Sequence, residues 1–299
     1  MSPEARQAAG RGAFAAGLCH VLWGLVPLYW KQLAGINSVE LIAHRIVWSL
    51  VFLIAIIAVR ADGGFAPVRT ALGTTRSVGR NLLSASLITV NWLVYVWSVN
   101  AGYVIECSLG YFLVPLVNVA MGRLVLHEQL RPAQWAAIGC ATVGVLLQVV
   151  QLGHLPVISL TLAATFGTYG LLRKKSPLGP LTGLTVETAL LAPLAIGFLL
   201  WRHFAGVGAL GRVDAVSDVL ILSSGVVTSV PLLLFAYGAR RIRLSTLGLL
   251  HYITPTVLFG LGVWVYREPF SPGRAATFAF IWCGLAFYTA DNLWTQRPR

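Results

Sequence analysis

The sequence predicts an all-α integral membrane protein of ten transmembrane helices, arranged as two five-helix repeats of inverted topology. Composition is the first observation behind this prediction. Of the 299 residues, 57% are hydrophobic and 11% are charged, whereas about 25% of the residues in an average soluble domain are charged. The second observation is that apolar runs of about 20 residues, the length that crosses a bilayer, recur along the chain. Similarity between the two halves of the chain predicts the repeat.

Charged or Gly- and Pro-rich segments separate the apolar runs and define the expected helices in order. In the first half of the chain, the runs cover residues 12–30, 38–59, 81–101, 106–125 and 133–152. In the second half, they cover residues 155–172, 181–201, 219–238, 246–266 and 273–292. At about 20 residues per helix, roughly 99 residues remain for the loops and tails, which leaves no room for a folded soluble domain. The two repeats, residues 1–152 and 153–299, are therefore the expected domains.

The basic residues predict the orientation of the helices, because cytoplasmic loops keep an excess of Lys and Arg. With the N-terminus inside, 16 of the 22 basic residues lie on the cytoplasmic side, among them Arg173, Lys174 and Lys175, and five lie outside. The remaining one, Arg45, lies within a helix. An even number of helices then places both termini in the cytoplasm. The net charge of +12 thus reflects the basic residues of the cytoplasmic loops and indicates the orientation of the helices. No nucleic acid partner is expected.

The N-terminus and the cysteines are interpreted as parts of the helical bundle. Arg6 and Arg11 precede an apolar run, as in a secretion signal, but the run is long enough to span and lacks a convincing small-residue cleavage site. We expect it to be a retained helix. The cysteines lie singly at wide spacings, which predicts helix packing and neither a metal site nor a disulfide: they are Cys19, Cys107, Cys140 and Cys283.

The two halves of the chain align with each other. A shift of 140 residues aligns Pro115 with Pro255 without gaps, and it aligns HEQLRP with REPFSP, whose Glu128 and Glu268 are expected turn elements. A weaker match uses a shift of 143 residues. Each half holds five helices, an odd number, so the second half enters the membrane in the opposite orientation. Such a repeat allows alternating access to a central site, although a scaffold or a fixed pore can also carry one.

Several segments of the sequence resemble a known family of transporters. They are LWGLVPLYWKQL, AHRIVWSL, NWLVYVWSVNAGYVIECSLGYFLVPL, FGTYGLLRKKSPL and LLHYITPTVLFG. Over nearly the whole chain, the sequence is similar to the RarD branch of the EamA-like transporters, in the drug/metabolite transporter (DMT) superfamily. This resemblance implies a multi-pass, five-plus-five inverted-repeat permease of the bacterial inner membrane, related to chloramphenicol sensitivity. That phenotype does not identify the transported molecule.

Ionisable residues within the apolar runs are the first site candidates, because such groups are costly in hydrocarbon. In the second expected helix, Glu40 and His44 share a face, whereas Arg45 points about 140° away from Glu40 and lies about 10 Å below the outer end. One interpretation is that His44 and Arg45 line a central cavity, where Arg45 holds an anionic group of a substrate or a carboxylate of the protein. The other is a structural arginine that bonds helix-end carbonyls or reaches outward to the interface.

Two further acidic residues are candidates for the transport path. The shift of 143 residues places Glu187, in the seventh expected helix, at the position equivalent to His44. Both groups would then face the central axis, where a proton could couple to solute exchange. The alternative for Glu187 is an interhelical hydrogen bond or ion pair. Glu106 begins the fourth expected helix, where a carboxylate complements the helix dipole, so an interfacial cap is favoured there over a transport role.

Prolines and aromatic residues indicate a moving, solute-facing segment. His251 and Tyr111 align, and each lies four residues before one of the paired prolines, Pro255 and Pro115. Because a proline frees a carbonyl and bends a helix, these positions flank the expected hinge; a lone membrane histidine can instead simply be hydrogen-bonded. Further lining candidates suit an amphipathic or aromatic solute and are equally compatible with packing: His20, Trp23, Pro27 and Trp30 in the first helix, and Asn91, Tyr95 and Ser98 in the third.

Together these features predict a secondary transporter, which exports or exchanges a small metabolite or drug-like solute across the lipid bilayer with protons as the expected coupling ion. The absence of a Walker A sequence argues against an ATP-driven pump. An intramembrane enzyme is the main alternative, yet the sequence contains no HExxH, no GxSxG and no paired aspartates. A receptor or assembly protein is a third alternative, for which the short loops leave little surface. We expect no catalytic residue, no metal and no cofactor.

Overall fold

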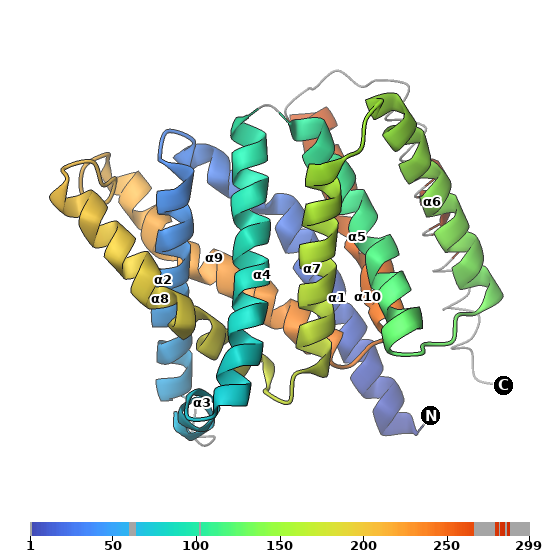
Figure 1. Ribbon diagram of the computed structural model, residues 1–299, viewed down its shortest axis with the longest axis horizontal. Helices are drawn as coiled ribbons and strands as arrows, with labels where there is room; N and C mark the ends of the chain where they lie inside the picture. The colour runs from blue at the N-terminus through green and yellow to red at the C-terminus, as the bar shows by residue number, and fades with distance from the viewer. Residues whose placement is uncertain are drawn as a thin grey trace.

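Long helices stand side by side in the computed structural model, which describes residues 2–59, 64–101, 103–265, 279–280, 282–284 and 286–287 (Figure 1). The first half of the chain contains α1 (Pro3–Trp30), α2 (Ser38–Val59), the short α3 (Ala66–Leu72), α4 (Thr75–Asn100), α5 (Val104–Val125) and α6 (Pro132–Leu152). The second half contains α7 (Val157–Lys175), α8 (Pro180–Phe204), α9 (Ala215–Ala239), α10 (Leu244–His251) and α11 (Ile253–Gly260), which continues as a π-helical turn at Leu261–Val265.

The described chain has the helices of a multi-pass membrane protein. Six of its helical segments are long and apolar enough to cross a bilayer: Glu4–Leu33, Ser38–Val59, Glu106–Val125, Pro180–Phe204, Ala215–Ala239 and Leu244–Val265. This confirms the predicted all-helical membrane class. In Figure 1, the connections between successive long helices alternate between two faces of the bundle. We name them the lower face, where the N-terminus and the starts of α4 and α8 lie, and the upper face, where α2, α7 and α9 begin.

Side chains that cap the first turn determine where several helices begin. The helix α2 has the predicted bounds, and the Asn37 side chain accepts hydrogen bonds at its start from the N–H groups of Val39 (3.0 Å) and Glu40 (3.2 Å). At the start of α9, Asp214 accepts from the Ser217 N–H (2.8 Å) and hydroxyl (3.0 Å), and these bonds lower the pKa of Asp214.

Several elements differ from the prediction because helices extend beyond the apolar runs. α1 begins at Pro3 and α4 begins at Thr75, several residues before the predicted starts at residues 12 and 81. At α1, the Ser2 hydroxyl accepts a hydrogen bond from the Ala5 N–H at 3.2 Å, so the helix is capped before the apolar run starts. The short amphipathic α3 was not predicted. The predicted helix at residues 273–292 lies largely outside the described residues, as do Glu268 and Pro272.

The ninth predicted helix, residues 246–266, is divided in the structure. α10 ends at His251, and α11 begins at Ile253 with Pro255 in its first turn. A proline has no N–H, so Pro255 cannot bond the carbonyl of His251 four residues earlier, and the helical ladder is interrupted there. Tyr252 lies at the break, and its hydroxyl donates a hydrogen bond to the Phe112 carbonyl of α5 at 3.3 Å.

A close approach of α2 and α9 positions the centre of the bundle. Gly225 of α9 packs against the backbone of Trp48, which occupies the place that a Cβ atom at Gly225 would need. The Ser49 hydroxyl donates a hydrogen bond to the Gly225 carbonyl at 3.3 Å. Thr228 follows Gly225 by about one helical turn, so this contact brings Thr228 next to Arg45 of α2.

Glu128 does more than the turn predicted for it. Its carboxylate accepts hydrogen bonds from the N–H groups of Leu244 (2.6 Å) and Ser245 (3.0 Å) and from the Ser245 hydroxyl (2.7 Å). These groups form the first turn of α10, where unpaired N–H groups and the helix dipole favour a negative charge. A segment that follows α5 therefore caps a helix of the second half of the chain.

We predict that Glu128→Ala lowers the stability of the folded protein by about 1–2 kcal/mol, because α10 loses its cap. Thermal unfolding of the purified protein in detergent measures the change. Gln129→Ala is the matched control, since the neighbouring Gln129 side chain is exposed. Equal unfolding temperatures for the two variants would contradict the assigned role of Glu128.

Candidate functional site

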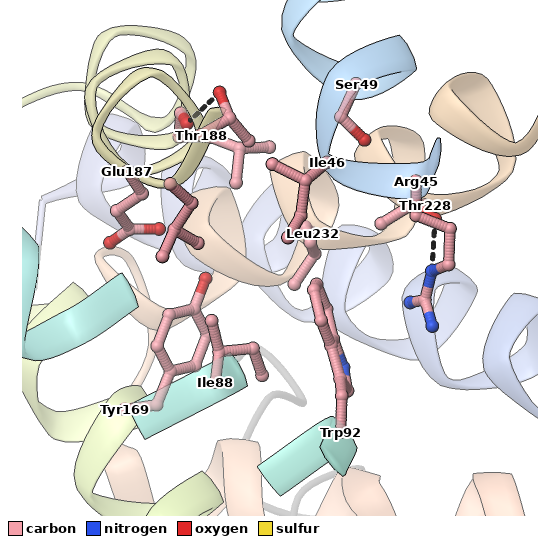
Figure 2. Close-up of a pocket in the computed structure, with 12 residues that line it drawn as sticks. Arg45, Ile46, Ser49, Ile88, Trp92, Tyr169, Glu187, Thr188, Thr228 and Leu232 are labelled. Atoms are coloured by element: carbon pink, nitrogen blue, oxygen red, sulfur yellow. Dashed lines mark hydrogen bonds between the residues drawn. The ribbon is translucent and has the colours of Figure 1, made fainter. Parts of the chain in front are cut away.

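Two cavities within the helical bundle contain the charged residues that the sequence analysis selected. The central cavity has a volume of about 20 Å³, room for about one water molecule, and is lined from α2, α4, α7, α8 and α9. Figure 2 shows Arg45 and Glu187 on opposite sides of this cavity, with Ile46 and Leu232 between them. Arg45 and Glu187, which the sequence selected as separate candidates, thus line one cavity in the structure.

Arg45 is held by aromatic rings and a hydroxyl. Its guanidinium carbon lies 4.3 Å from the ring centroid of Trp92 on α4 and 4.9 Å from that of Trp30 on α1. Its Nε donates a hydrogen bond to the Thr228 hydroxyl of α9 at 2.9 Å. Within the described part of the chain, Arg45 forms no ion pair with a carboxylate. Cation–π contacts thus stabilise the charge without neutralising it.

Glu187 forms a buried ion pair on the other side of the central cavity. Its Oε1 accepts from Arg173 Nη1 at 3.1 Å and from the Ser84 hydroxyl at 2.6 Å. Its Oε2 is buried and has no hydrogen-bond partner among the described residues, and the same holds for the Tyr169 hydroxyl. The Arg173 side chain is 1% exposed and that of Glu187 is 3% exposed. The pair joins α7 to α8, and Ser84 adds α4.

Arg173 was predicted to lie just beyond the end of a helix, on the cytoplasmic side, but it lies within α7 and is buried. The sixth expected helix was predicted to end at residue 172, but α7, which corresponds to it, extends to Lys175. The extra turn carries Arg173 onto the buried face of the helix. No sequence signal identifies this pairing, because the partner Glu187 lies beyond a turn and Ser84 lies more than one hundred residues earlier.

The second cavity, which we name the lower cavity, opens near the lower ends of α4 and α7. Its volume is about 300 Å³. It is lined by Arg80, Asn81, Ser84, Leu172, Arg173, Lys175, Ser176 and Glu187. Glu187 lines both the lower and the central cavity. The Arg173–Glu187 pair therefore lies at the boundary between them.

Glu40 and His44 lie apart from the central cavity. Glu40 is buried, and its Oε2 accepts from Arg202 of α8 at 2.8 Å while its Oε1 accepts from the Ala209 N–H at 2.7 Å. His44 Nε2 lies 3.8 Å from Glu40 Oε1. Of the two residues predicted to line the cavity from α2, only Arg45 does so. Glu40 instead fastens the start of α2 to the end of α8 and the connection that follows.

Glu106 and Asn91 also hold helices together. Glu106 is buried near the start of α5, and its Oε1 lies 3.9 Å from His154 Nε2 in the connection between α6 and α7. Asn91 of α4 donates hydrogen bonds to the Leu162 carbonyl and to the Thr165 hydroxyl of α7, both at 2.9 Å. These contacts agree with the structural alternatives and place neither side chain on the cavities.

An aromatic and histidine cluster lies between the end of α10 and the interior of α1. His251 is buried, and its ring centroid lies 4.7 Å from that of His20, 5.4 Å from that of Phe166 and 6.1 Å from that of Tyr111. Neither ring nitrogen of His251 has a hydrogen-bond partner among the described residues. Among the described residues, the contacts of His251 are therefore with other rings.

The remaining aromatic candidates extend this cluster. Trp23 packs against His20 with ring centroids 5.4 Å apart, and Tyr95 packs against Tyr111 at 5.7 Å. The two paired prolines differ in position, because Pro115 lies inside α5 whereas Pro255 lies in the first turn of α11. In the described part of the chain, no group of three His, Cys, Asp or Glu side chains could hold a metal ion.

Comparisons with known proteins show relatives over nearly the full length. The profile of the EamA-like transporter family matches residues 10–150. Protein RarD of Streptomyces exfoliatus is 45% identical over 277 residues, which cover 92% of this chain and 87% of the relative. An uncharacterized transporter of Vibrio cholerae is 39% identical over 293 residues, which cover 98% of this chain and 96% of the relative.

A solved crystal structure shares the fold. It superposes with a TM-score of 0.71 and covers 93% of this chain and 97% of its own, at 19% sequence identity. The relatives are transporters and not enzymes, which decides against the intramembrane enzyme considered from the sequence. The chain therefore belongs to the EamA-like transporter family and is a multi-pass membrane transporter related to the RarD proteins.

Proposed function

We propose that the protein is a secondary carrier of the bacterial inner membrane, which moves a small anionic, amphipathic solute by alternating access with a proton as coupling ion. Residues 1–152 and 153–299 form the two inverted repeats, and both termini lie in the cytoplasm. The lower face of Figure 1 is then the cytoplasmic face. The observation that carries this proposal is that Arg45 and Glu187 line one central cavity from α2 and α8.

The positions of Arg45 and Glu187 support the inverted repeat. Each lies seven residues after the first residue of its helix, Ser38 for α2 and Pro180 for α8. At 1.5 Å per residue, each is about 10 Å from its end of the bundle. α2 begins at the upper face and α8 begins at the lower face. Arg45 therefore lies at the same depth from the upper face as Glu187 does from the lower face. Such a pair of sites suits a carrier that opens alternately to each side.

The surroundings of Arg45 indicate the chemistry of the solute. The guanidinium group lies between Trp30 and Trp92 and, within the described chain, has no carboxylate partner. A carboxylate or phosphate group of the solute would supply that partner, through the fork of N–H donors that suits such anions. The neighbouring rings of Trp92 and Tyr169 suit an apolar or aromatic body.

Glu187 couples the proton to solute movement. The groups that face its carboxylate are Arg173 and Tyr169 of α7 and Ser84 of α4. While Arg173 contacts Glu187, the carboxylate is compensated. When Arg173 turns to the solute, an ionised Glu187 would be buried without a partner, which is costly in a low-dielectric interior. Glu187 therefore takes up a proton as Arg173 leaves it. Pro115 in α5 and Pro255 at the start of α11 are the proposed hinges of the movement.

Purified protein in liposomes tests the carrier function. We expect saturable counterflow of an anionic aromatic probe, benzoate, and stimulation of its uptake by an imposed pH gradient. Protein-free liposomes control for diffusion of benzoic acid along the pH gradient, and neutral benzamide controls for charge recognition. Chloramphenicol tests the phenotype that the sequence resemblance implies. Absence of counterflow for a broad panel of anionic and neutral solutes would contradict the proposal.

Arg45→Lys tests the anion-binding role. Lysine keeps the positive charge but loses the planar fork that stacks on the tryptophan rings, so we expect the KM for benzoate to rise about tenfold, the loss of roughly 1.4 kcal/mol of binding. Arg212→Lys is the matched control, because Arg212 is exposed in the connection between α8 and α9. A KM for Arg45→Lys equal to that of the control would exclude Arg45 from solute binding.

Glu187→Gln combined with Arg173→Gln tests proton coupling. The single change Glu187→Gln would leave Arg173 buried without its partner, at a cost of about 3–5 kcal/mol, so the double change separates coupling from unfolding. We expect benzoate counterflow to continue at a reduced rate while stimulation by the pH gradient disappears. Ser84→Ala, which removes a hydrogen bond to Glu187 but no charge, should retain the stimulation. Persistent pH-driven uptake in the double variant would remove Glu187 from the mechanism.

A further inference from the structure

The three consecutive basic residues at the end of α7 point to three different surroundings. Arg173 bonds Glu187 inside the bundle. Lys174 donates hydrogen bonds to the Ala239 carbonyl at 3.3 Å and to the Ile242 carbonyl, at the end of α9. Lys175 lines the lower cavity. Successive residues of a helix differ by about 100° in direction. The three neighbouring side chains therefore reach an ion pair, the end of another helix and a cavity, respectively.

The lower cavity is rich in hydrogen-bond donors with a positive charge. Three cationic side chains line it, Arg80, Arg173 and Lys175, against the single carboxylate of Glu187. Its volume of about 300 Å³ is at the lower end of the range for small-molecule sites. The amide of Asn81 and the hydroxyls of Ser84 and Ser176 complete a polar lining.

Several of these donors are unused. Arg80 and Lys175 are exposed and form no side-chain hydrogen bond or ion pair with the described residues. Arg173 has five N–H donors, yet its contacts are one bond to Glu187 and a long one, 3.4 Å, to the Pro180 carbonyl. Its Nε is buried and has no partner in the described chain. An unpaired buried donor is costly, and a bound anion would satisfy it.

The electrostatic field at this end of the bundle favours an anion. Arg240, just after α9, donates a hydrogen bond to the Leu178 carbonyl at 2.6 Å. Partial burial, and then the positive charges of Arg173 and Arg241, lower the pKa of Arg240. Of these cations only Arg173 lines the lower cavity, and the positive charge behind it favours a ligand of opposite charge there.

From this geometry we propose that the lower cavity is a binding site for a small oxyanion, a carboxylate or phosphate group of a soluble molecule, held by Arg173, Lys175 and Arg80. Arg173 is the residue that links this site to the central cavity, because it contacts Glu187 at the boundary between them. The site rests on the proposed function in one respect: the anion that it binds is the charged group of the transported solute, in transit to Arg45. Binding itself requires no transport.

Binding measurements on the full chain test the site. The protein is placed in nanodiscs of zwitterionic phosphatidylcholine at low ionic strength, where exposed charges are least screened. Calorimetry then measures the affinities for inorganic phosphate, for benzoate and for benzamide. We expect the two anions to bind and the neutral benzamide not to bind. Equal binding of benzoate and benzamide would overturn the proposal.

Two charge variants identify the cavity as the place of binding. Arg80→Gln with Lys175→Gln should weaken phosphate and benzoate binding at least about tenfold, the effect of losing a charge-assisted hydrogen bond. Arg69→Gln with Arg76→Gln is the matched control, because it removes two exposed positive charges near the lower face but none that lines the cavity. The control should change the affinities less than twofold. Equal weakening in both double variants would show a general charge effect and overturn the site.

Two further comparisons are needed. One distinguishes a lipid headgroup from a soluble anion, and the other distinguishes the anion site from the proposed carrier function. If phosphatidylglycerol in the nanodiscs abolishes phosphate binding, the cavity holds a lipid headgroup and the proposal of a soluble ligand is wrong. Unchanged phosphate binding supports a soluble anion. Arg45→Lys should leave phosphate binding in the lower cavity intact while it impairs transport. Phosphate binding that is sensitive to Arg80→Gln and Lys175→Gln, in a protein that transports nothing, would retain the site and reject the carrier function.

Discussion

The buried ion pair between Arg173 and Glu187, with 3.1 Å between Nη1 and Oε1, is the contact on which the account of this transporter depends. Two buried charges are expensive to remove from water and more expensive to separate, because each would then lack a partner. The pair fastens α7 to α8, and Ser84 adds α4. It also lies where the lower cavity meets the central one. In the proposed mechanism, a solute that passes between the cavities exchanges partners with this pair.

Arg45, unlike Arg173, has no carboxylate partner within the described chain. Its charge is stabilised by two indole rings and one hydroxyl, which leave it uncompensated within the described chain. The close packing of Gly225 against α2 sets this geometry, since it brings Thr228 beside Arg45. Glu40 contacts α8 and the connection after it, Glu106 contacts the connection between α6 and α7, and Asn91 bonds α7. Glu40 and Glu106 thus fasten helices away from the cavities, Arg45 faces a cavity, and the Arg173–Glu187 pair does both.

The sequence was sufficient for the membrane class and for the bounds of α2. It also selected Arg45 and Glu187 as separate candidates, and both line the central cavity. Hydropathy identifies a span and a charge within it, because both are local properties. The Arg173–Glu187 pair was not predictable, since it depends on one extra turn of α7 and on packing against α8. Likewise, His44 lies next to Arg45 in sequence, but the ion pair of Glu40 holds that face of α2 away from the cavity. The division at Tyr252 follows from Pro255, whose effect on a helix depends on how neighbouring helices satisfy the freed carbonyl.

The central claim is that a bound anion takes Arg173 from Glu187, which then takes up a proton. Difference infrared spectroscopy of the reconstituted protein, with and without benzoate at constant pH, measures this directly. Comparison with the double variant Glu187→Gln and Arg173→Gln, which leaves no buried charge unpaired, assigns the signal to Glu187. The account predicts that benzoate removes a carboxylate band and produces the band of a protonated carboxyl, and that both changes are absent in the double variant. Saturable benzoate binding with no change in the carboxyl bands of the unmodified protein would contradict it.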